Sequence, residues 1–223
     1  MQIVLHHLEH SRSHRILWLL EELELPYALK TYERDAGMRA PAALREVHPL
    51  GKSPTLEIDG VVFAESGAII EELVDHAGAL KPEAGTEAHR RYRFFMHYAE
   101  GSLMPPLLVG LITGLLKGDR VPWIVRPIAK GIAKQIDGTF TDGEVARHAA
   151  FLQSELQSRE YLCGPELTAA DVQMSYPVEA LLTRGVDAPA LTTYLERLAA
   201  RPAYQRAVEK GGTVMPPYRK NAG

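Results

Sequence analysis

Two hydrophobic periodicities divide this chain of 223 residues. Short apolar runs of strand length alternate with helical patterns up to about residue 77. From residue 86 onward the apolar patterns repeat with the period of a helix, and no segment there predicts a strand. This order of elements predicts an α/β part followed by an all-helical part.

The first part predicts a strand, helix, strand, helix, β-hairpin and helix in that order. Asp59-Gly60 stands between two short apolar runs, which is typical of a hairpin turn. Pro26 marks the end of the first helix, and Ser66 begins the last one. The strands are expected at residues 3–6, 27–32, 53–58 and 61–63, and the helices at 15–25, 39–48 and 66–77.

The second part predicts only helices. Pro105-Pro106 should break or kink the first of them. Thr168 and Asp171 have the spacing of a capping box, so they are expected to start a helix rather than to take part in catalysis. The five helices are expected at residues 88–116, 122–136, 143–157, 168–182 and 188–200.

These patterns also predict the domain boundaries. A polar segment rich in Gly, Lys, Pro and Glu, residues 78–85, predicts a linker. The expected domains are therefore residues 1–80 and residues 86–210. Residues 211–223 contain Gly and Pro among polar residues and are expected to form a mobile tail.

Charge and cysteine content exclude several classes of protein. The formal net charge is -3, so no nucleic-acid partner is expected. No unbroken apolar run of membrane-spanning length occurs, so no membrane partner is expected either. Cys163 is the one cysteine, which excludes an internal disulfide, a dithiol redox motif and a zinc site built on paired cysteines. A reducing, cytoplasmic location is the corresponding expectation.

Three segments together resemble the glutathione S-transferase superfamily, in particular its serine-type bacterial and fungal members. They are SRSHRILWLLEEL at residues 11–23, GKSPTLEIDGVVFAESGAIIEEL at 51–73 and LTAADVQMSYP at 167–177. The resemblance extends to about residue 202. It implies a thioredoxin-like domain, a helical domain and a homodimer. It also implies reduced glutathione as co-substrate in a transferase that detoxifies small electrophilic molecules.

Glu65 and Ser66 stand where a strand meets a helix. The first amides of a helix lack partners within the helix and attract anions. Ser66 is expected to cap the helix and to donate to a carboxylate, while Glu65 accepts from an ammonium group. Together they suit the γ-glutamyl end of glutathione. The alternative is that Ser66 is only a cap and Glu65 only a solvated charge.

Lys52, Ser53 and Pro54 are the next candidates for glutathione binding. The resemblance implies that the Ser53–Pro54 bond is cis and that the backbone of Ser53 pairs with the cysteinyl part of glutathione. It also implies that Lys52 reaches the glycyl carboxylate as a point charge. The alternative for Lys52 is an ordinary exposed lysine.

Ser11 and Ser13 are the catalytic candidates. The glutathione thiol is mostly protonated at neutral pH because a free thiol titrates near pH 8.5, so a donor that stabilises the thiolate is required. Ser11 stands four residues before Arg15, the spacing of serine-type family members. Ser11 is preferred and Ser13 is second. The alternative is that both serines only cap the helix, leaving helix-end amides or Arg12 to hold the thiolate.

Other expectations concern metals and the second substrate. His6, His7, His10 and His14 cluster in the sequence, but no carboxylate or cysteine set completes a metal site, so no metal is expected. Apolar lining for the electrophile is expected from Tyr98, Met104, Leu107 and Leu108, and Glu100 is a candidate to reach glutathione across a dimer interface.

Three function classes stay open at this point. The leading one is a glutathione transferase acting on small electrophiles. The second is a glutathione-dependent disulfide reductase or peroxidase. The third is a non-catalytic binder of glutathione or apolar ligands, because a fold does not determine a function.

Overall fold

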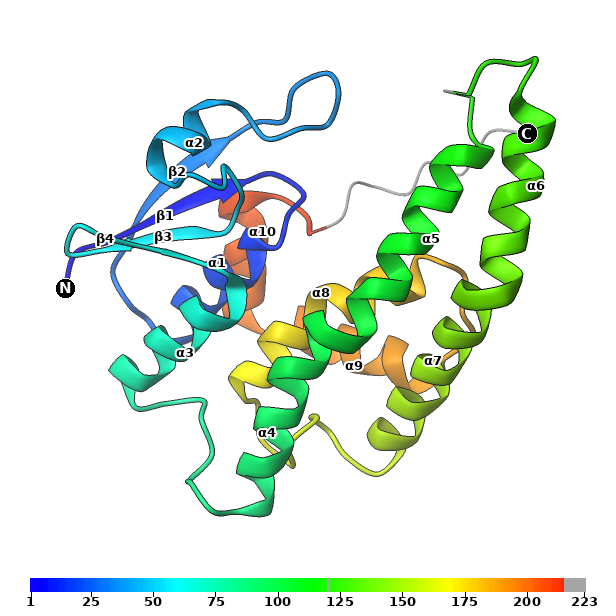
Figure 1. The fold of residues 1–223 in the computed structure, drawn as a ribbon. Coiled ribbons are helices and arrows are strands. Elements are labelled where there is room, and N and C mark those ends of the chain that lie inside the picture. Colours follow the sequence, from blue (N-terminus) through cyan, green and yellow to red (C-terminus); the bar gives the residue numbers. More distant parts are fainter. Residues whose placement is uncertain (120, 215–223) are drawn as a thin grey trace.

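The computed structural model describes residues 1–119 and 121–214, and its N-terminal part is built on a four-stranded sheet (Figure 1). The strands are β1 (Ile3–Leu8), β2 (Ala28–Tyr32), β3 (Thr55–Ile58) and β4 (Val61–Ala64). The sheet order is β2-β1-β3-β4, with β2 parallel to β1 and the other neighbours antiparallel. All four predicted strands are confirmed.

Three helices complete the thioredoxin-like domain. They are α1 (Ser13–Glu22), the short α2 (Ala43–Val47) and α3 (Ser66–Ala77). Helices α1 and α3 pack against each other, α1 on β1 and α3 on β4. The predicted fold class is confirmed: a thioredoxin-like α/β domain precedes an all-helical domain.

The helical domain begins with a long hairpin that differs from the predicted separate helices. Its first limb runs through α4 (Glu87–Tyr98), the π-helical turn η1 (Ala99–Leu103) and α5 (Met104–Lys117). Its second limb runs through α6 (Arg126–Ile136), the π-helical turn η2 (Asp137–Thr141) and α7 (Asp142–Gln157).

Pro105-Pro106 were expected to break or kink the first limb, and they do not break it. The two prolines fall in the first turn of α5, where a backbone amide needs no partner within the helix. The chain changes to a π turn just before them and continues as a helix. Likewise, the predicted helices 122–136 and 143–157 are one continuous limb, because η2 bridges them.

Three further helices close the fold. Helix α8 (Ala169–Leu182) packs against α4 and α1, and α9 (Pro189–Ala199) packs against α7 and α8. Helix α10 (Pro202–Gly211), which sequence analysis did not predict, returns to pack against α1. The C-terminal end of the helical chain therefore covers the first domain. One continuous cluster of buried apolar side chains spans both parts, including the fully buried Trp18, Tyr92 and Val172.

The predicted capping box at the start of α8 is confirmed. The Asp171 carboxylate accepts from the Thr168 amide and hydroxyl, each at 2.9 Å. It also accepts from the Leu162 amide and the Tyr194 hydroxyl, each at 2.9 Å. Asp171 is fully buried. Four donors therefore hold one carboxylate that joins α8 to α9 and to the preceding loop, which supports a role in folding.

The predicted tail of residues 211–223 lies largely outside the described residues. Its first residues are packed: the Gly211 carbonyl contacts His7 Nε2 at 2.9 Å, and Val214 is buried.

Candidate functional site

Most of the residues predicted for the site gather at one edge of the sheet. Strands β1 and β4 end there and β3 begins there, because β3 is antiparallel to both neighbours. Thr55, next to Pro54, pairs with Ala64, next to Glu65. The amide of Leu8, the last residue of β1, donates to the hydroxyls of both Ser13 and Ser53, at 3.1 and 3.3 Å.

Ser11 and Ser13 form a compact hydroxyl network at the turn between β1 and α1. Their Oγ atoms are 2.8 Å apart. Ser11 Oγ donates to the Leu8 carbonyl at 2.8 Å and accepts from the Ser13 amide at 3.2 Å. Ser13 Oγ lies 2.9 Å from His7 Nδ1.

The protonation state of His7 determines whether the Ser13 hydroxyl donates to it or accepts from it. His7 Nε2 faces the Gly211 carbonyl, which only accepts, so Nε2 carries a proton. Burial lowers the pKa of His7, which keeps the ring neutral and leaves Nδ1 as an acceptor. The Ser13 hydroxyl therefore donates to His7. Ser13 is fully buried and Ser11 is 6% exposed, and the Ser11 hydroxyl donates to the Leu8 carbonyl instead of to a side chain.

The segment before β3 has the predicted backbone. The Ser53–Pro54 bond is cis, as expected. Ser53 Oγ donates to the His6 carbonyl at 3.2 Å, and the Lys52 carbonyl accepts from Thr55 Oγ1 at 2.8 Å. The Lys52 side chain is exposed.

The junction of β4 and α3 differs in one respect from expectation. Glu65, not Ser66, occupies the N-cap position, with a φ of 73°. Ser66 is the first helical residue and is buried. The first helical bond runs from the Ile69 amide to the Glu65 carbonyl at 3.0 Å, so the amides of residues 66–68 precede the helical ladder. A left-handed cap residue thus presents these amides at the end of β4, where they suit an anion.

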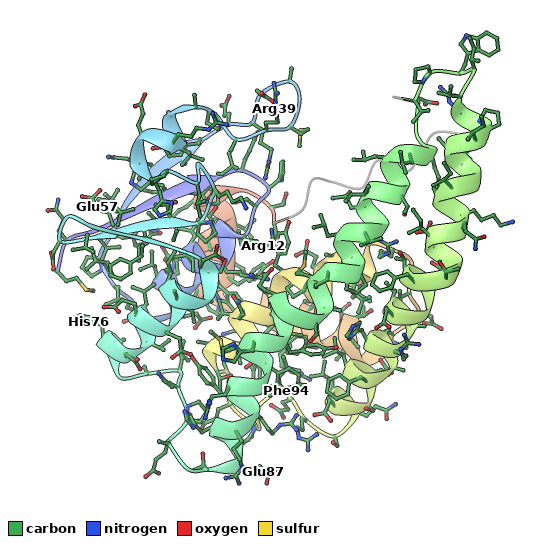
Figure 2. The ribbon with its side chains drawn as sticks, viewed as in Figure 1. Arg12, Arg39, Glu57, His76, Glu87 and Phe94 are labelled. Carbon is green, nitrogen blue, oxygen red and sulfur yellow. The ribbon has the colours of Figure 1, made fainter. Side chains whose placement is uncertain are left out.

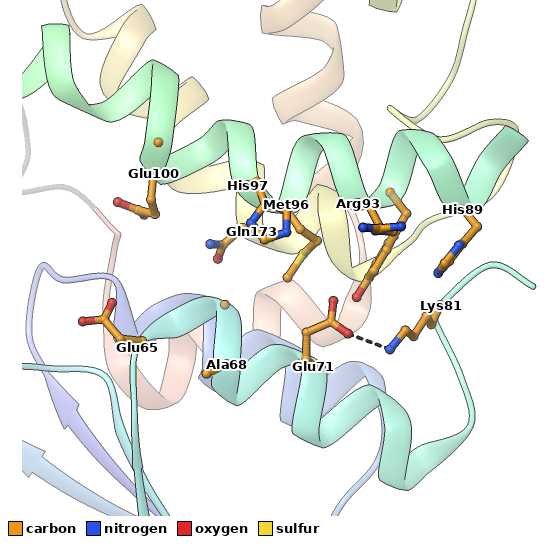
Figure 3. A pocket seen from close by; sticks show the side chains of 13 residues that line it. Glu65, Ala68, Glu71, Lys81, His89, Arg93, Met96, His97, Glu100 and Gln173 are labelled. Carbon is orange, nitrogen blue, oxygen red and sulfur yellow. Dashed lines mark hydrogen bonds and ion pairs between the residues drawn. The ribbon is translucent and has the colours of Figure 1, made fainter. Parts of the chain in front are cut away.

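Two arginines and Glu100 form a cluster that the sequence did not predict. Glu100 Oε1 accepts from Arg15 Nη1 at 2.7 Å and from Arg12 Nε at 3.1 Å, all within one chain. Both guanidinium groups also lie over the Tyr176 ring. Figure 3 shows Glu100 on the helix facing Glu65, so Glu100 needs no second chain to reach this edge.

Arg15 is the most constrained charge in this cluster. Its side chain is 1% exposed, and burial lowers its pKa to about 10 although Glu100 opposes that shift. Among the described residues, its Nε and Nη2 atoms have no hydrogen-bond partner. Burial disfavours ionised Glu100, but the guanidinium groups of Arg15 and Arg12 keep the pKa of that carboxyl below its usual value. Both groups are therefore charged at neutral pH.

Two hollows open beside this edge. One lies between α3 and α4, has a volume of about 770 Å³ and has Glu65, Glu100 and Gln173 in its lining (Figure 3). The other is an apolar groove of about 1010 Å³ between α5 and α8. Arg12 stands in the lining of the groove, and the lining includes Met104, Leu107, Leu108, Leu111, Leu115 and Tyr176.

Three of the four residues expected to line the electrophile site lie in this groove. Met104, Leu107 and Leu108 line the groove. Tyr98 does not: its hydroxyl bonds with His148 Nδ1, and the ring is buried against Phe151. Sequence spacing could not separate them, because the π turn η1 between Tyr98 and Met104 rotates the faces of the helix relative to each other.

The four N-terminal histidines have separate partners, and that of His10 Nδ1 is the Thr213 carbonyl at 3.2 Å. His6 Nδ1 meets the Tyr32 hydroxyl at 2.9 Å, and His7 meets Ser13 and Gly211. His14 packs edge-on against Tyr204. In residues 1–119 and 121–214, no group of three or more potential ligand side chains is placed to hold a metal ion.

Comparisons with known proteins agree on one family. Residues 11–76 match the family model described as "Glutathione S-transferase, N-terminal domain". Glutathione S-transferase 1 of Saccharomyces cerevisiae is 34% identical over 222 residues, covering 93% of this chain and 94% of the yeast protein. Glutathione S-transferase 3 of Schizosaccharomyces pombe is 41% identical over 180 residues, covering 80% of this chain and 74% of that protein.

Solved structures agree as well. A glutathione S-transferase from Actinobacillus pleuropneumoniae has a TM-score of 0.79 at 33% identity, covering 94% of this chain and 92% of that chain. A glutathione transferase homologue from Sulfitobacter, solved with bound glutathione, shares the fold with a TM-score of 0.71 at 19% identity, covering 95% of this chain and 99% of that chain.

Proposed function

This chain belongs to the glutathione S-transferase superfamily, and on that premise we propose that it activates the thiol of glutathione for attack on small electrophilic molecules. The observation that carries this proposal is the convergence at one sheet edge. The cis Ser53–Pro54 bond, the first amides of α3 and the Ser11 hydroxyl meet there, next to an apolar groove.

The tripeptide is held at its two ends and its middle. Glu65 accepts from the α-ammonium group, while Ser66 and the first amides of α3 bind the α-carboxylate. Among the described residues none bonds the Ser66 hydroxyl, so it is available to a ligand. The backbone of Ser53, before cis-Pro54, pairs with the cysteinyl unit, and exposed Lys52 meets the glycyl carboxylate.

Ser11 is the donor to the thiolate. In the free protein the Ser11 hydroxyl donates to the Leu8 carbonyl; when glutathione binds, it donates to the sulfur instead. Ser13 stays hydrogen-bonded to His7. Arg12, in the lining of the groove, adds positive charge near the developing thiolate. The proton of the thiol passes to water, and the thiolate sulfur bonds to the electrophilic carbon while a halide leaves, an epoxide C–O bond opens, or an enone double bond yields an enolate; the alkoxide or enolate then takes a proton from water.

The electrophile occupies the groove between α5 and α8. Its apolar lining, Met104, Leu107 and Leu108, removes the substrate from water, and the groove begins beside Arg12. The choice of electrophile therefore depends on the shape and polarity of this groove.

Assembly and location complete the proposal. We propose a homodimer that uses the outer face of α4, where Phe94 is 49% exposed next to Arg93 and His97 (Figure 2). We also propose that the two domains comprise residues 1–80 and 86–210. The proposed location is the reducing cytoplasm. Cys163 is buried and unpaired, as expected of a structural thiol in such a compartment.

Turnover tests this function. The protein should conjugate glutathione to a model aryl halide, an epoxide or an enone, and the Glu65→Ala variant should require more glutathione for the same rate. Faster turnover of a peroxide or a small mixed disulfide would assign it to the reductase class instead. Glutathione binding without turnover of any of these substrates would leave only the non-catalytic class.

A further inference from the structure

The hairpin formed by α5 and α6 projects from the body of the protein (Figure 1), and many of its large apolar side chains are exposed. At its end, Trp123 is 77% exposed, Ile124 70% and Ile128 67%. Leu111, Ile112 and Leu115 on α5 are each more than half exposed. We call residues 111–119 and 121–128 the hairpin tip.

This exposure is concentrated rather than scattered. Of the sixteen most exposed large apolar side chains in the described residues, ten lie between residues 108 and 140. Single exposed apolar residues are ordinary, but a continuous patch marks a surface that binds something. The helical run Glu87–Lys117 contains an 18-residue window of mean hydropathy 1.4, of which only 33% is buried.

The charges around the hairpin tip indicate what it binds. Residues 117–134 contain five basic residues and one acidic residue, within a chain whose formal net charge is -3; of the five, Lys117 pairs with Asp137 and Arg126 with Asp119. Lys130 and Lys134 on α6 are exposed, and no carboxylate in the described part of the chain pairs with them. An apolar tip with a basic collar matches a bilayer surface that carries anionic headgroups.

The spacing along α6 fits docking by the end of the hairpin. Lys130 and Lys134 stand four and eight residues after Arg126, which begins α6. At a helical rise of 1.5 Å per residue they lie about 6 and 12 Å behind that point. The buried depth of interfacial segments is about 5–10 Å, so an inserted tip would place both lysines at the headgroups.

A second copy of this chain is a poorer occupant of the same surface. Two identical tips in contact would bring two pairs of exposed lysines, Lys130 and Lys134 of each copy, together, and like charges across an interface are unfavourable. Lipid headgroups supply the opposite charge. Leu111 and Leu115 also line the apolar groove, so docking would bring one end of the groove to the membrane.

We propose that the hairpin tip docks the protein peripherally on anionic lipid bilayers, with Trp123 and Ile124 inserted among the lipids and Lys130 and Lys134 at the headgroups. This revises the sequence-based expectation that the protein has no membrane partner. It does not depend on the proposed catalytic function.

The two tryptophans make a direct test possible. Trp18 is fully buried and Trp123 is 77% exposed, so Trp123 reports on the hairpin tip. The full-length protein is mixed with vesicles of phosphatidylglycerol and phosphatidylcholine, or of phosphatidylcholine alone. We expect a blue shift of the emission and quenching by brominated acyl chains with the anionic vesicles, and binding that weakens as salt is added.

Variants define the contribution of each part. Ile124→Ser should reduce binding to anionic vesicles by about tenfold in cosedimentation, because it removes a buried apolar side chain. Lys130→Gln with Lys134→Gln should reduce it by about fivefold per lysine and remove most of the salt dependence. Val61→Ser is the matched control, since Val61 is 59% exposed on β4, outside the hairpin tip. Thermal melting of each variant checks the fold.

Three results would overturn the proposal. The first is an emission spectrum that anionic vesicles leave unchanged. The second is equal binding to both vesicle types at all salt concentrations, which would remove the role of the lysines. The third is a lower oligomeric state of Ile124→Ser than of the parent protein without lipid, which would assign the hairpin tip to a second copy.

Discussion

Arg15 on α1 donates from Nη1 to Oε1 of Glu100 at 2.7 Å, across the boundary between the two domains. Gln173 on α8 meets the same Arg15 nitrogen at 3.3 Å. A charge that is 1% exposed therefore depends on one carboxylate from the other domain. This pair ties α1, which begins at the turn of Ser11 and Ser13, to the limb that lines the apolar groove.

Removing Glu100 should destabilise the protein. Glu100→Ala leaves the Arg15 guanidinium buried without a counter-ion; because the Glu100 side chain is itself 37% exposed, the loss should be smaller than the roughly 3–5 kcal/mol of a fully buried pair. Chemical denaturation measures the loss. The control is Arg39→Ala, which breaks the surface pair with Asp35 and should leave stability unchanged. Equal stability of Glu100→Ala and the parent protein would show that Arg15 does not need its partner.

Glutathione affinity should depend on the start of α3. Glu65→Ala leaves a charged ammonium group of the ligand unpaired, a loss of about 1.5–3 kcal/mol, which is a tenfold or greater rise in the dissociation constant. Ser66→Ala should weaken binding less. Isothermal titration measures both. Glu71→Ala is the control, because Glu71 lines the same hollow but is paired with Lys81. Unchanged affinity in both test variants would remove the assignment of this site.

Ser11 should control the pKa of the bound glutathione thiol. Ser11→Ala removes the donor, so that pKa should rise by about one to two units and activity at pH 7 should fall by roughly ten- to a hundredfold. Activity should recover in part at higher pH, where the thiolate forms without help. Thiolate absorbance as a function of pH measures the shift, and glutathione affinity should change little.

Ser13→Ala is the partner experiment. Its hydroxyl donates to His7, so the variant should lose about 1 kcal/mol of stability while the thiol titrates as before. If the pKa of the bound thiol shifts in Ser13→Ala and not in Ser11→Ala, Ser13 is the donor to the thiolate and Ser11 is not. No shift in either variant would leave the thiolate to Arg12 or the helix-end amides.

Acid should destabilise the protein through His14. Burial lowers the pKa of His14 from 6.5 to about 4 in the folded state. Below pH 6.5 the unfolded chain therefore binds a proton at His14 that the folded protein does not bind. The stability that neutral His14 contributes is complete above pH 6.5 and is lost as the pH falls towards 4. One pKa unit corresponds to about 1.4 kcal/mol, so protonation of His14 should lower the free energy of unfolding by about 3 kcal/mol.

The variant His14→Phe should flatten this pH dependence. It keeps the ring contact with Tyr204 and removes the titrating group. Melting temperatures between pH 7 and 4.5 measure the effect, with His76→Phe on the exposed side of α3 as the control for losing one histidine. The same slope in His14→Phe and the parent protein would place the acid sensitivity elsewhere.

Loss of Asp171 should impair folding rather than catalysis. Asp171→Ala leaves up to four buried donors without an acceptor, and each unsatisfied group costs about 1–3 kcal/mol. The melting temperature should fall sharply, while glutathione affinity of the folded fraction stays near that of the parent protein. A normal melting temperature with lost activity would contradict the structural role.

Local sequence determined the elements whose causes are local. The Asp59-Gly60 turn, the Thr168–Asp171 capping box and the alternating strands and helices of the first domain depend on neighbouring residues, and the structure has all of them. The resemblance to a known family added the cis bond before Pro54, which base rates alone would not predict.

Tertiary structure alone decided the contacts between residues far apart in the chain. Arg15 and Glu100 are 85 residues apart, and His7 and Gly211 are 204 residues apart. No periodicity encodes such pairs, because they form only when packing brings separate elements together. The same reason explains why the Ser13 hydroxyl donates to His7, whose other ring nitrogen meets Gly211, and why the apolar residues of the α5–α6 hairpin are exposed rather than buried in a core. Sequence composition shows that these residues are apolar, but only the fold shows which side chains water still reaches.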